Sequence, residues 1–164
     1  MPRKCMGQTI RQISFDRIVK TARFATMTRA FSNEELATFL SSSKEQAEIV
    51  ADVVVQIGLL ETDDRNYCET SACSAFLNYV REDDEAGLHR LMMDYPIYRI
   101  FFTQLQTMEP TTIDQILVRL ESLSIPFPRD VLNMVCKWGE QIGSVQRNSV
   151  TNTYFSVIKP LKRG

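Results

Sequence analysis

Apolar residues recur at helical spacing in two successive stretches, Asn33–Leu40 and Lys44–Ile57, which predicts two helices joined by a short turn. Two short runs of strand type follow, Leu59–Thr62 and Tyr67–Thr70, on either side of a turn at residues 63–66. The buried stripe of the second helix is expected to be Ala47, Val50, Val54 and Ile57, with Ile49 and Val53 beside it. The pattern therefore predicts helix, turn, helix and β-ribbon.

Local signals support these boundaries. Ser32 and Glu35 have the spacing of a capping box, in which the hydroxyl and the carboxylate each accept a backbone N–H. Ser42 or Ser43 can cap the second helix, and Gly58 stands where the chain must leave that helix with positive φ. A plain helical hairpin followed by a strand pair of another α+β fold would give the same signals.

The flanking segments are also read as helices. Residues 10–31 have a roughly helical apolar pattern, which predicts a first helix with a possible break and cap at Ser14 or Asp16. Thr70 or Ser71 is expected to cap the next helix. Further apolar stripes are predicted at Cys73, Phe76, Leu77 and Val80, then at Leu88, Leu91, Met92 and Tyr95, and after Pro96 at Ile97, Ile100, Phe101, Leu105 and Met108. His89 is expected on the polar side, and the last stripe is expected to be buried between two modules.

The first pattern returns in the last third of the chain. Thr111 is expected to cap a helix over Thr112–Ser122, and a turn with two prolines separates it from a helix over Arg129–Ile142. The core stripe of this second helix is predicted to be Val131, Val135, Trp138 and Ile142. Strand-type runs follow at Ser144–Arg147 and Thr153–Ile158. Gln56-Ile57-Gly58 matches Gln141-Ile142-Gly143 at an offset of 85 residues, so we interpret the chain as a tandem repeat.

This order of elements resembles the winged helix-turn-helix superfamily, with the sequence Val53-Val54-Val55-Gln56-Ile57-Gly58-Leu59-Leu60 closing the long helix before the wing. The resemblance implies a mainly α fold with small β-wings, made of two winged helix-turn-helix modules joined by a helical bridge. The division expected is a flexible basic arm (1–9), a first module (10–70), the bridge (71–108), a second module (109–158) and a basic tail (159–164). The superfamily implies DNA binding in transcription control, or in some members docking to other proteins.

Charge divides the chain into three parts. Residues 1–31 carry seven Lys/Arg against one Asp, residues 32–128 carry six against seventeen Asp/Glu, and residues 129–164 carry six against two. Both ends are therefore basic around an acidic middle, although the net charge is only −1. A polyanionic partner would meet the ends.

The expected DNA contacts lie mainly in the second module, where Asn and Gln can pair with adenine and Arg and Lys can contact guanine or phosphate. They are Arg129, Asn133, Lys137, Gln141 and Arg147, with Lys159, Lys162 and Arg163 of the tail and Arg3 and Lys4 of the arm. In the first module only Ser43 and Lys44 suit DNA, because the outward helix face carries Glu45, Glu48 and Asp52. These three carboxylates are instead candidates for binding a protein partner.

Composition and motifs narrow the classes of function that the sequence predicts. Neither the four cysteines nor the single histidine has the spacing of a metal site, and no apolar run is long enough to cross a membrane. No catalytic or cofactor-binding motif is present, so we expect a non-enzymatic protein without cofactor or metal, in the cytoplasm. The leading hypothesis is a regulator that binds duplex DNA, with a homodimer as one possible form. The alternative is a docking subunit of a larger DNA-processing or defence complex.

Overall fold

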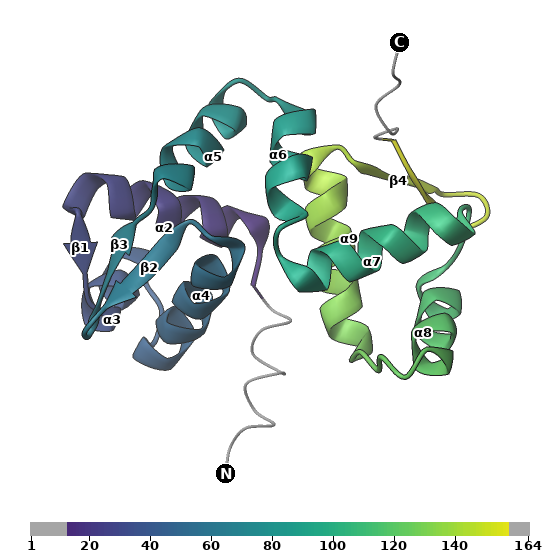
Figure 1. Cartoon of the computed structure of the whole chain (residues 1–164), viewed down its shortest axis with the longest axis horizontal. Coiled ribbons are helices and arrows are strands. Elements are labelled where there is room, and N and C mark those ends of the chain that lie inside the picture. The colour runs from purple at the N-terminus through teal and green to yellow at the C-terminus, as the bar shows by residue number, and fades with distance from the viewer. Residues whose placement is uncertain (1–12, 158–164) are drawn as a thin grey trace.

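The computed structural model of the chain describes residues 13–157, which are mainly helical with two small antiparallel sheets (Figure 1). This confirms the mainly α class with small β-ribbons. The elements are α2 (Phe15–Thr28), β1 (Ala30–Phe31), α3 (Asn33–Leu40), α4 (Lys44–Ile57), β2 (Leu60–Asp63), β3 (Asn66–Glu69), α5 (Ser71–Arg81), α6 (Glu85–Met92), α7 (Pro96–Met108), α8 (Ile113–Ser122), α9 (Arg129–Ile142), β4 (Val145–Asn148) and β5 (Thr153–Ser156). No helix among them combines the length and the apolar character that a membrane-crossing segment needs.

The first unit runs from α2 to β3. Ser32 and Glu35 form the predicted capping box at the start of α3, and Ser43 rather than Ser42 caps α4 by accepting the N–H of Gln46. Gly58 ends α4 with φ of +102°, a conformation that costs a residue with a Cβ about 1 kcal/mol or more. The chain then forms the hairpin β2–β3, and β1 adds to β3 to give the strand order β1-β3-β2.

The second unit runs from α7 to β5 and has the same order of elements. A capping box between Thr112 and Gln115 starts α8, and Gly143 ends α9 with φ of +106°. Thr111 pairs with Tyr154 of β5 through two backbone hydrogen bonds, in the place where β1 pairs with β3 in the first unit. α7 packs against α8, α9 and β5, as α2 packs against α3, α4 and β3.

Each unit contains an ion pair at the equivalent place. Glu34, in the first turn of α3, lies 2.8 Å from Nζ of Lys44, the first residue of α4. Asp114, in the first turn of α8, forms the corresponding ion pair with Arg129, the first residue of α9. The same contact at the same place in both units supports the interpretation of the chain as a repeat.

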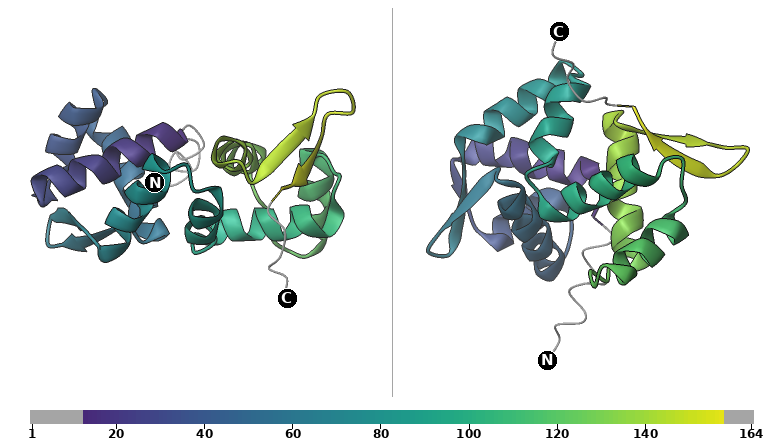
Figure 2. Two further views of the ribbon diagram at one scale, coloured as in Figure 1. Left: turned by 90° about the horizontal axis from the view of Figure 1, so that it is seen from above. Right: turned by 45° about the vertical axis from the view of Figure 1, so that its right-hand side comes forward.

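The units meet where the start of α2 lies against the end of α9. The indole Nε1 of Trp138 donates to the backbone oxygen of Ile13 at 3.1 Å, and Nε2 of Gln141 donates to Asp16 at 3.0 Å. α5 and α6 connect the units on one side, and α6 also packs against α9 (Figures 1 and 2). The buried apolar side chains of both units belong to one continuous core.

Several boundaries differ from those predicted by short-range pattern. The first helix ends at Thr28, because Ala30 and Phe31 pair with β3 as a strand. Thr112, not Thr111, caps α8, since Thr111 is held in the strand pairing with Tyr154. The β2–β3 strands lie one residue closer to their turn than predicted, and β5 ends at Ser156. Thr70 precedes α5 at the cap position, but its hydroxyl donates to the backbone oxygen of Gly58 instead.

The expected positions of α7 and His89 need larger corrections. The most buried face of α7 consists of Tyr98, Phe101, Phe102 and Leu105, while Ile97, Ile100 and Met108 are only partly buried. His89 is buried rather than on a polar face, because α7 covers it with the rings of Tyr98 and Phe102. The Tyr98 hydroxyl lies 3.0 Å from Nδ1 of His89 and 2.7 Å from Oγ of Ser144. These bonds tie α6 and α7 to the start of β4.

The burial of His89 predicts a loss of stability in mild acid. Burial, together with Arg90, lowers the pKa of His89 below its ordinary value of 6.5. Below pH 6.5 the unfolded chain therefore binds the proton more readily than the folded chain, and stability falls; above pH 6.5 the ring is neutral in both states. Urea unfolding of the native chain and of His89→Gln between pH 7.5 and 5.5 measures this contribution. The variant should lose less stability over that interval, and equal losses would contradict the assignment.

Candidate nucleic-acid interface

The candidate interface consists of the exposed polar side of α9 and the adjoining strand β4. Arg129, Lys137 and Arg147 are all exposed there. Arg129 starts α9 and is ion-paired with Asp114, and Arg147 donates to the side-chain oxygen of Asn152 at 3.1 Å across the β4–β5 turn. Lys137 and Arg147 both act electrostatically on the thiol of Cys136, which places their charges on the same part of the unit.

Two of the residues predicted to contact DNA bases are less accessible to DNA than the helical periodicity indicated. Asn133 is partly buried, and the exposed Gln141 holds Asp16 of the first unit. The reason is that α6, α7, α8 and β4 all pack against α9. Its buried positions therefore include, besides the predicted stripe, Leu132, Met134, Cys136 and Gly139. This leaves Arg129, which is ion-paired with Asp114, and Lys137 as the exposed cationic positions of the predicted face.

Charged groups of both signs act on the side chains around β4. Burial raises the pKa of the Cys136 thiol to about 12; the carboxylate of Glu140 acts in the same direction, whereas Arg147 and Lys137 oppose it. Burial also raises the pKa of Tyr154, the cross-strand partner of Arg147. Residues 96–157 carry five Lys/Arg and five Asp/Glu, so the described part of the second unit is neutral overall.

Both ends of the described chain are attached close to α9. Ile13 accepts the hydrogen bond of Trp138, in the last turns of α9, and the N–H of Val157 donates to Ser144, just after the same helix. The predicted phosphate contacts Arg3, Lys4, Lys159, Lys162 and Arg163 lie outside the described residues, beyond these two attachment points.

The first unit presents the opposite charge at equivalent positions. An offset of 85 residues places Glu48 where the second unit has Asn133, Asp52 where it has Lys137, and Thr62 where it has Arg147. Glu45 and Glu48 are exposed, and Asp52 is partly buried, so that burial, assisted by the charge of Glu48, raises its pKa. Residues 33–69 carry nine Asp/Glu against two Lys/Arg.

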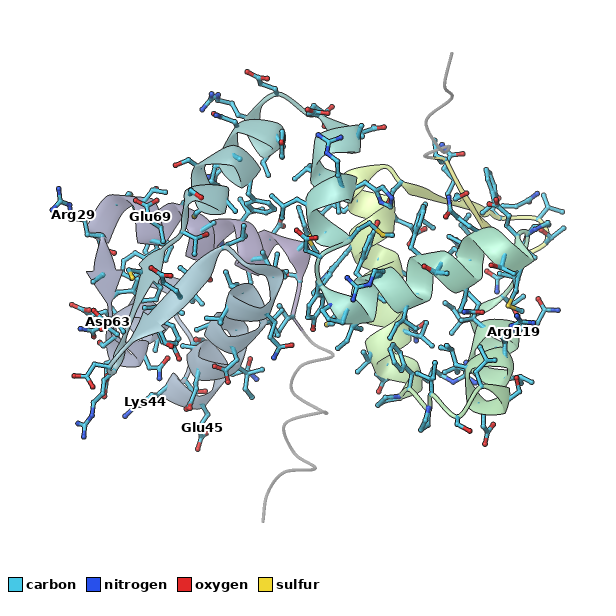
Figure 3. All side chains as sticks on the ribbon, in the orientation of Figure 1. Arg29, Lys44, Glu45, Asp63, Glu69 and Arg119 are labelled. Carbon is cyan, nitrogen blue, oxygen red and sulfur yellow. The ribbon has the colours of Figure 1, made fainter. Side chains whose placement is uncertain are left out.

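The two first-unit residues that suited DNA are both engaged. Ser43 accepts the N–H of Gln46 as the cap of α4, and Lys44 is bound to Glu34, which raises the pKa of the lysine. Lys44 and Glu45 extend from the start of α4 at the end of the unit where Asp63 of the hairpin also lies (Figure 3). The surroundings of Lys44 are thus acidic.

Sequence reasoning missed the acidic partners of the candidate residues. Asp114 binds Arg129, Asp16 accepts a hydrogen bond from Gln141, and Glu140 acts on the thiol of Cys136 in the direction opposite to Lys137 and Arg147. The pair of Asp114 and Arg129 could be predicted from the repeat, because Glu34 and Lys44 occupy the equivalent positions in the first unit. No sequence pattern predicts the contact between Asp16 and Gln141, because these residues are 125 positions apart.

Residues 13–157 contain no group of three or more His, Cys, Asp or Glu side chains arranged to hold a metal ion. The hydrogen-bonded series His89, Tyr98 and Ser144 has the residue types of a catalytic relay, but all three are buried. In this arrangement they join helices rather than face a substrate. Comparisons of the chain with protein-family models, with curated proteins and with solved structures found no match.

Proposed function

We propose that the chain is a non-enzymatic DNA-binding protein made of two winged helix-turn-helix units, in which the second unit contacts duplex DNA and serves transcription regulation. The proposal is supported by the order of elements that both units share: a first helix, a short strand pairing, two helices and a β-hairpin. In winged helices the second of the paired helices and the hairpin commonly face the nucleic acid. In the second unit these elements are α9 and β4–β5.

The single observation that carries the proposal is the attachment of both basic ends at α9. Ile13 is bonded to Trp138, and Val157 to Ser144, and the six Lys/Arg of residues 1–12 and 158–164 precede and follow these two residues in the sequence. The described part of the second unit is neutral, so the proposal depends on these terminal cations for its net positive charge. Duplex DNA carries one negative charge for about every 1.7 Å of its length and attracts such a concentration of cations.

The contacts are expected to be mainly with the DNA backbone. Lys137 and Arg147 reach phosphates from α9 and from the hairpin, and Arg129 exchanges the carboxylate of Asp114 for a phosphate at the start of α9. The exchange costs little, because an ion pair with side chains 56% and 69% exposed contributes about 0–1 kcal/mol. Asn133 is partly buried and Gln141 is bonded to Asp16, so base reading is limited. We therefore expect weak sequence preference.

The terminal cations provide the test of this proposal. Changing Arg3, Lys4, Lys159, Lys162 and Arg163 to Gln removes five charges beyond the described residues, and should weaken binding to a 20-base-pair duplex and flatten its salt dependence. Fluorescence anisotropy at several salt concentrations measures both quantities. The matched control changes five cations on other surfaces: Arg29, Lys44, Arg65, Arg81 and Arg90. Equal losses in both variants would contradict a role for the second unit.

A second function, docking to a basic protein, is favoured by the acidic side of the first unit. Glu45, Glu48 and Asp52 lie at intervals of three and four residues along α4, with Asp52 partly buried. Glu48→Lys with Asp52→Lys should then release a co-purifying partner from the native assembly, whereas Glu121→Lys with Glu140→Lys should not. DNA affinity that rises in the first variant, without a lost partner, would exclude docking.

A further inference from the structure

A cleft of about 280 Å³ lies where the two units meet. One wall is a single face of α2, and the other walls come from the end of α5 with its following turn, α6, and the end of α9. Its apolar part is formed by Phe15, Val19, Leu88 and Ile142, which are between 3% and 8% exposed. The cleft therefore has an apolar floor built from both units.

Two cations stand over this floor. Lys20 and Arg23 lie about one turn apart on α2, and both line the cleft and are exposed. No ion pair joins either side chain to another residue of the described range 13–157. The cleft also contains two carboxylates, so its charged lining residues are two of each sign: Asp16, whose Oδ1 accepts the amide of Gln141, and Asp83 in the turn between α5 and α6. Within the described residues neither carboxylate is ion-paired to Lys20 or Arg23, which leaves these two cations available to an anion.

We propose that this cleft binds a small amphipathic carboxylate, with an apolar ring or a short alkyl chain against the floor and the carboxylate between Lys20 and Arg23. Ligand sites are commonly apolar clefts of about 300–1,000 Å³ between domains, with a few polar groups that fix orientation. The present volume lies just below that range and limits the ligand to one or two rings. A guanidinium and an ammonium together give the carboxylate charge-assisted hydrogen bonds.

Such a ligand would act on the junction of the units. It touches α2 of the first unit and α9 of the second, and the bonded pair Asp16 and Gln141 is part of the cleft lining. A molecule that binds only this arrangement stabilises it by RT ln(1 + c/Kd), which grows with the ligand concentration c. The junction would then respond to the concentration of the ligand, whether or not the second unit binds DNA.

The test uses three probes of one shape on the full chain: 2-naphthoate, the uncharged 2-naphthamide and the cationic 2-naphthylmethylammonium. Affinities come from calorimetry. Quenching of Trp138, the single tryptophan, reports binding near the end of α9. We expect 1:1 binding in which the carboxylate is about tenfold tighter than the amide, a difference equal to one charge-assisted contact. The ammonium compound should bind weakest.

Exposed substitutions show whether the preference arises in this cleft. Lys20→Gln with Arg23→Gln should remove the tenfold preference and keep the weak binding of the amide, because the apolar floor is intact. Arg29→Gln with Arg65→Gln removes two charges of the same unit outside the cleft and should change nothing. The proposal is overturned by absence of naphthoate binding, by tightest binding of the ammonium probe, or by an equal preference in the Lys20/Arg23 variant.

Discussion

Changing Lys137 to Asp and Arg147 to Thr is expected to reduce the affinity of the chain for duplex DNA about a hundredfold at ~0.1 M salt. These substitutions give the second unit the residues that the first unit has at equivalent positions, Asp52 and Thr62. Each lost phosphate contact lowers affinity about tenfold at this salt concentration, and the log–log salt slope should become shallower by about 1.8. Titration of a labelled duplex at several salt concentrations measures both effects.

The reciprocal variant is the control for this prediction. Asp52→Lys with Thr62→Arg places the second unit's cations on α4 and β2 without touching α9. It changes the net charge of the chain in the opposite direction and should not reduce DNA binding. If Lys137→Asp with Arg147→Thr retains native affinity and slope, α9 and β4 do not contact the phosphates.

Changing Trp138 to Ala is expected to destabilise the fold by about 3–5 kcal/mol, the usual cost of deleting a large buried aromatic side chain. Trp138 is 1% exposed, its ring lies 5.8 Å from that of Tyr95, and its indole N–H donates to Ile13 of the other unit. The substitution therefore removes packing within the second unit and a bond between the units. Denaturant unfolding followed by circular dichroism measures the loss, since the variant has no tryptophan fluorescence.

A milder substitution separates the two contributions. Trp138→Phe keeps most of the apolar volume and removes the hydrogen bond to Ile13, which should cost about 1–3 kcal/mol because the acceptor is left buried. A single cooperative transition in both variants is expected from the continuous core. A loss below about 1 kcal/mol in Trp138→Ala would contradict the packing described for the junction.

The predictions that depended on short-range signals agree best with the fold. Ser32 and Glu35 act within three residues of each other, and Gly58 and Gly143 terminate helices through their own φ angles. In each of these cases all the residues that act lie within one short segment, so a sequence pattern can locate the helix boundary. The 14-residue helices α4 and α9 have the predicted limits for this reason.

The predictions that failed concern sides of helices that distant elements cover. His89 lies on a side of α6 that α7 buries, and the ring contacts with Tyr98 and Phe102 are not visible in the periodicity of α6 itself. Gln141 is exposed on α9 as predicted, but its bond to Asp16 at the start of α2, 125 residues away in the sequence, could not be predicted from the periodicity. Periodicity identifies the side of a helix that must be buried, and it does not identify a second side that a neighbour also covers.

The central claim is that the second unit and the chain ends attached to it bind duplex DNA through phosphates. The most direct measurement is the affinity of the full chain for a duplex of about 20 base pairs between roughly 50 and 200 mM salt. Six or more phosphate contacts predict a log–log slope of about −5 or steeper, with strong retention at the lowest salt. Absence of retention at low salt, or binding that salt leaves unchanged, would contradict the claim.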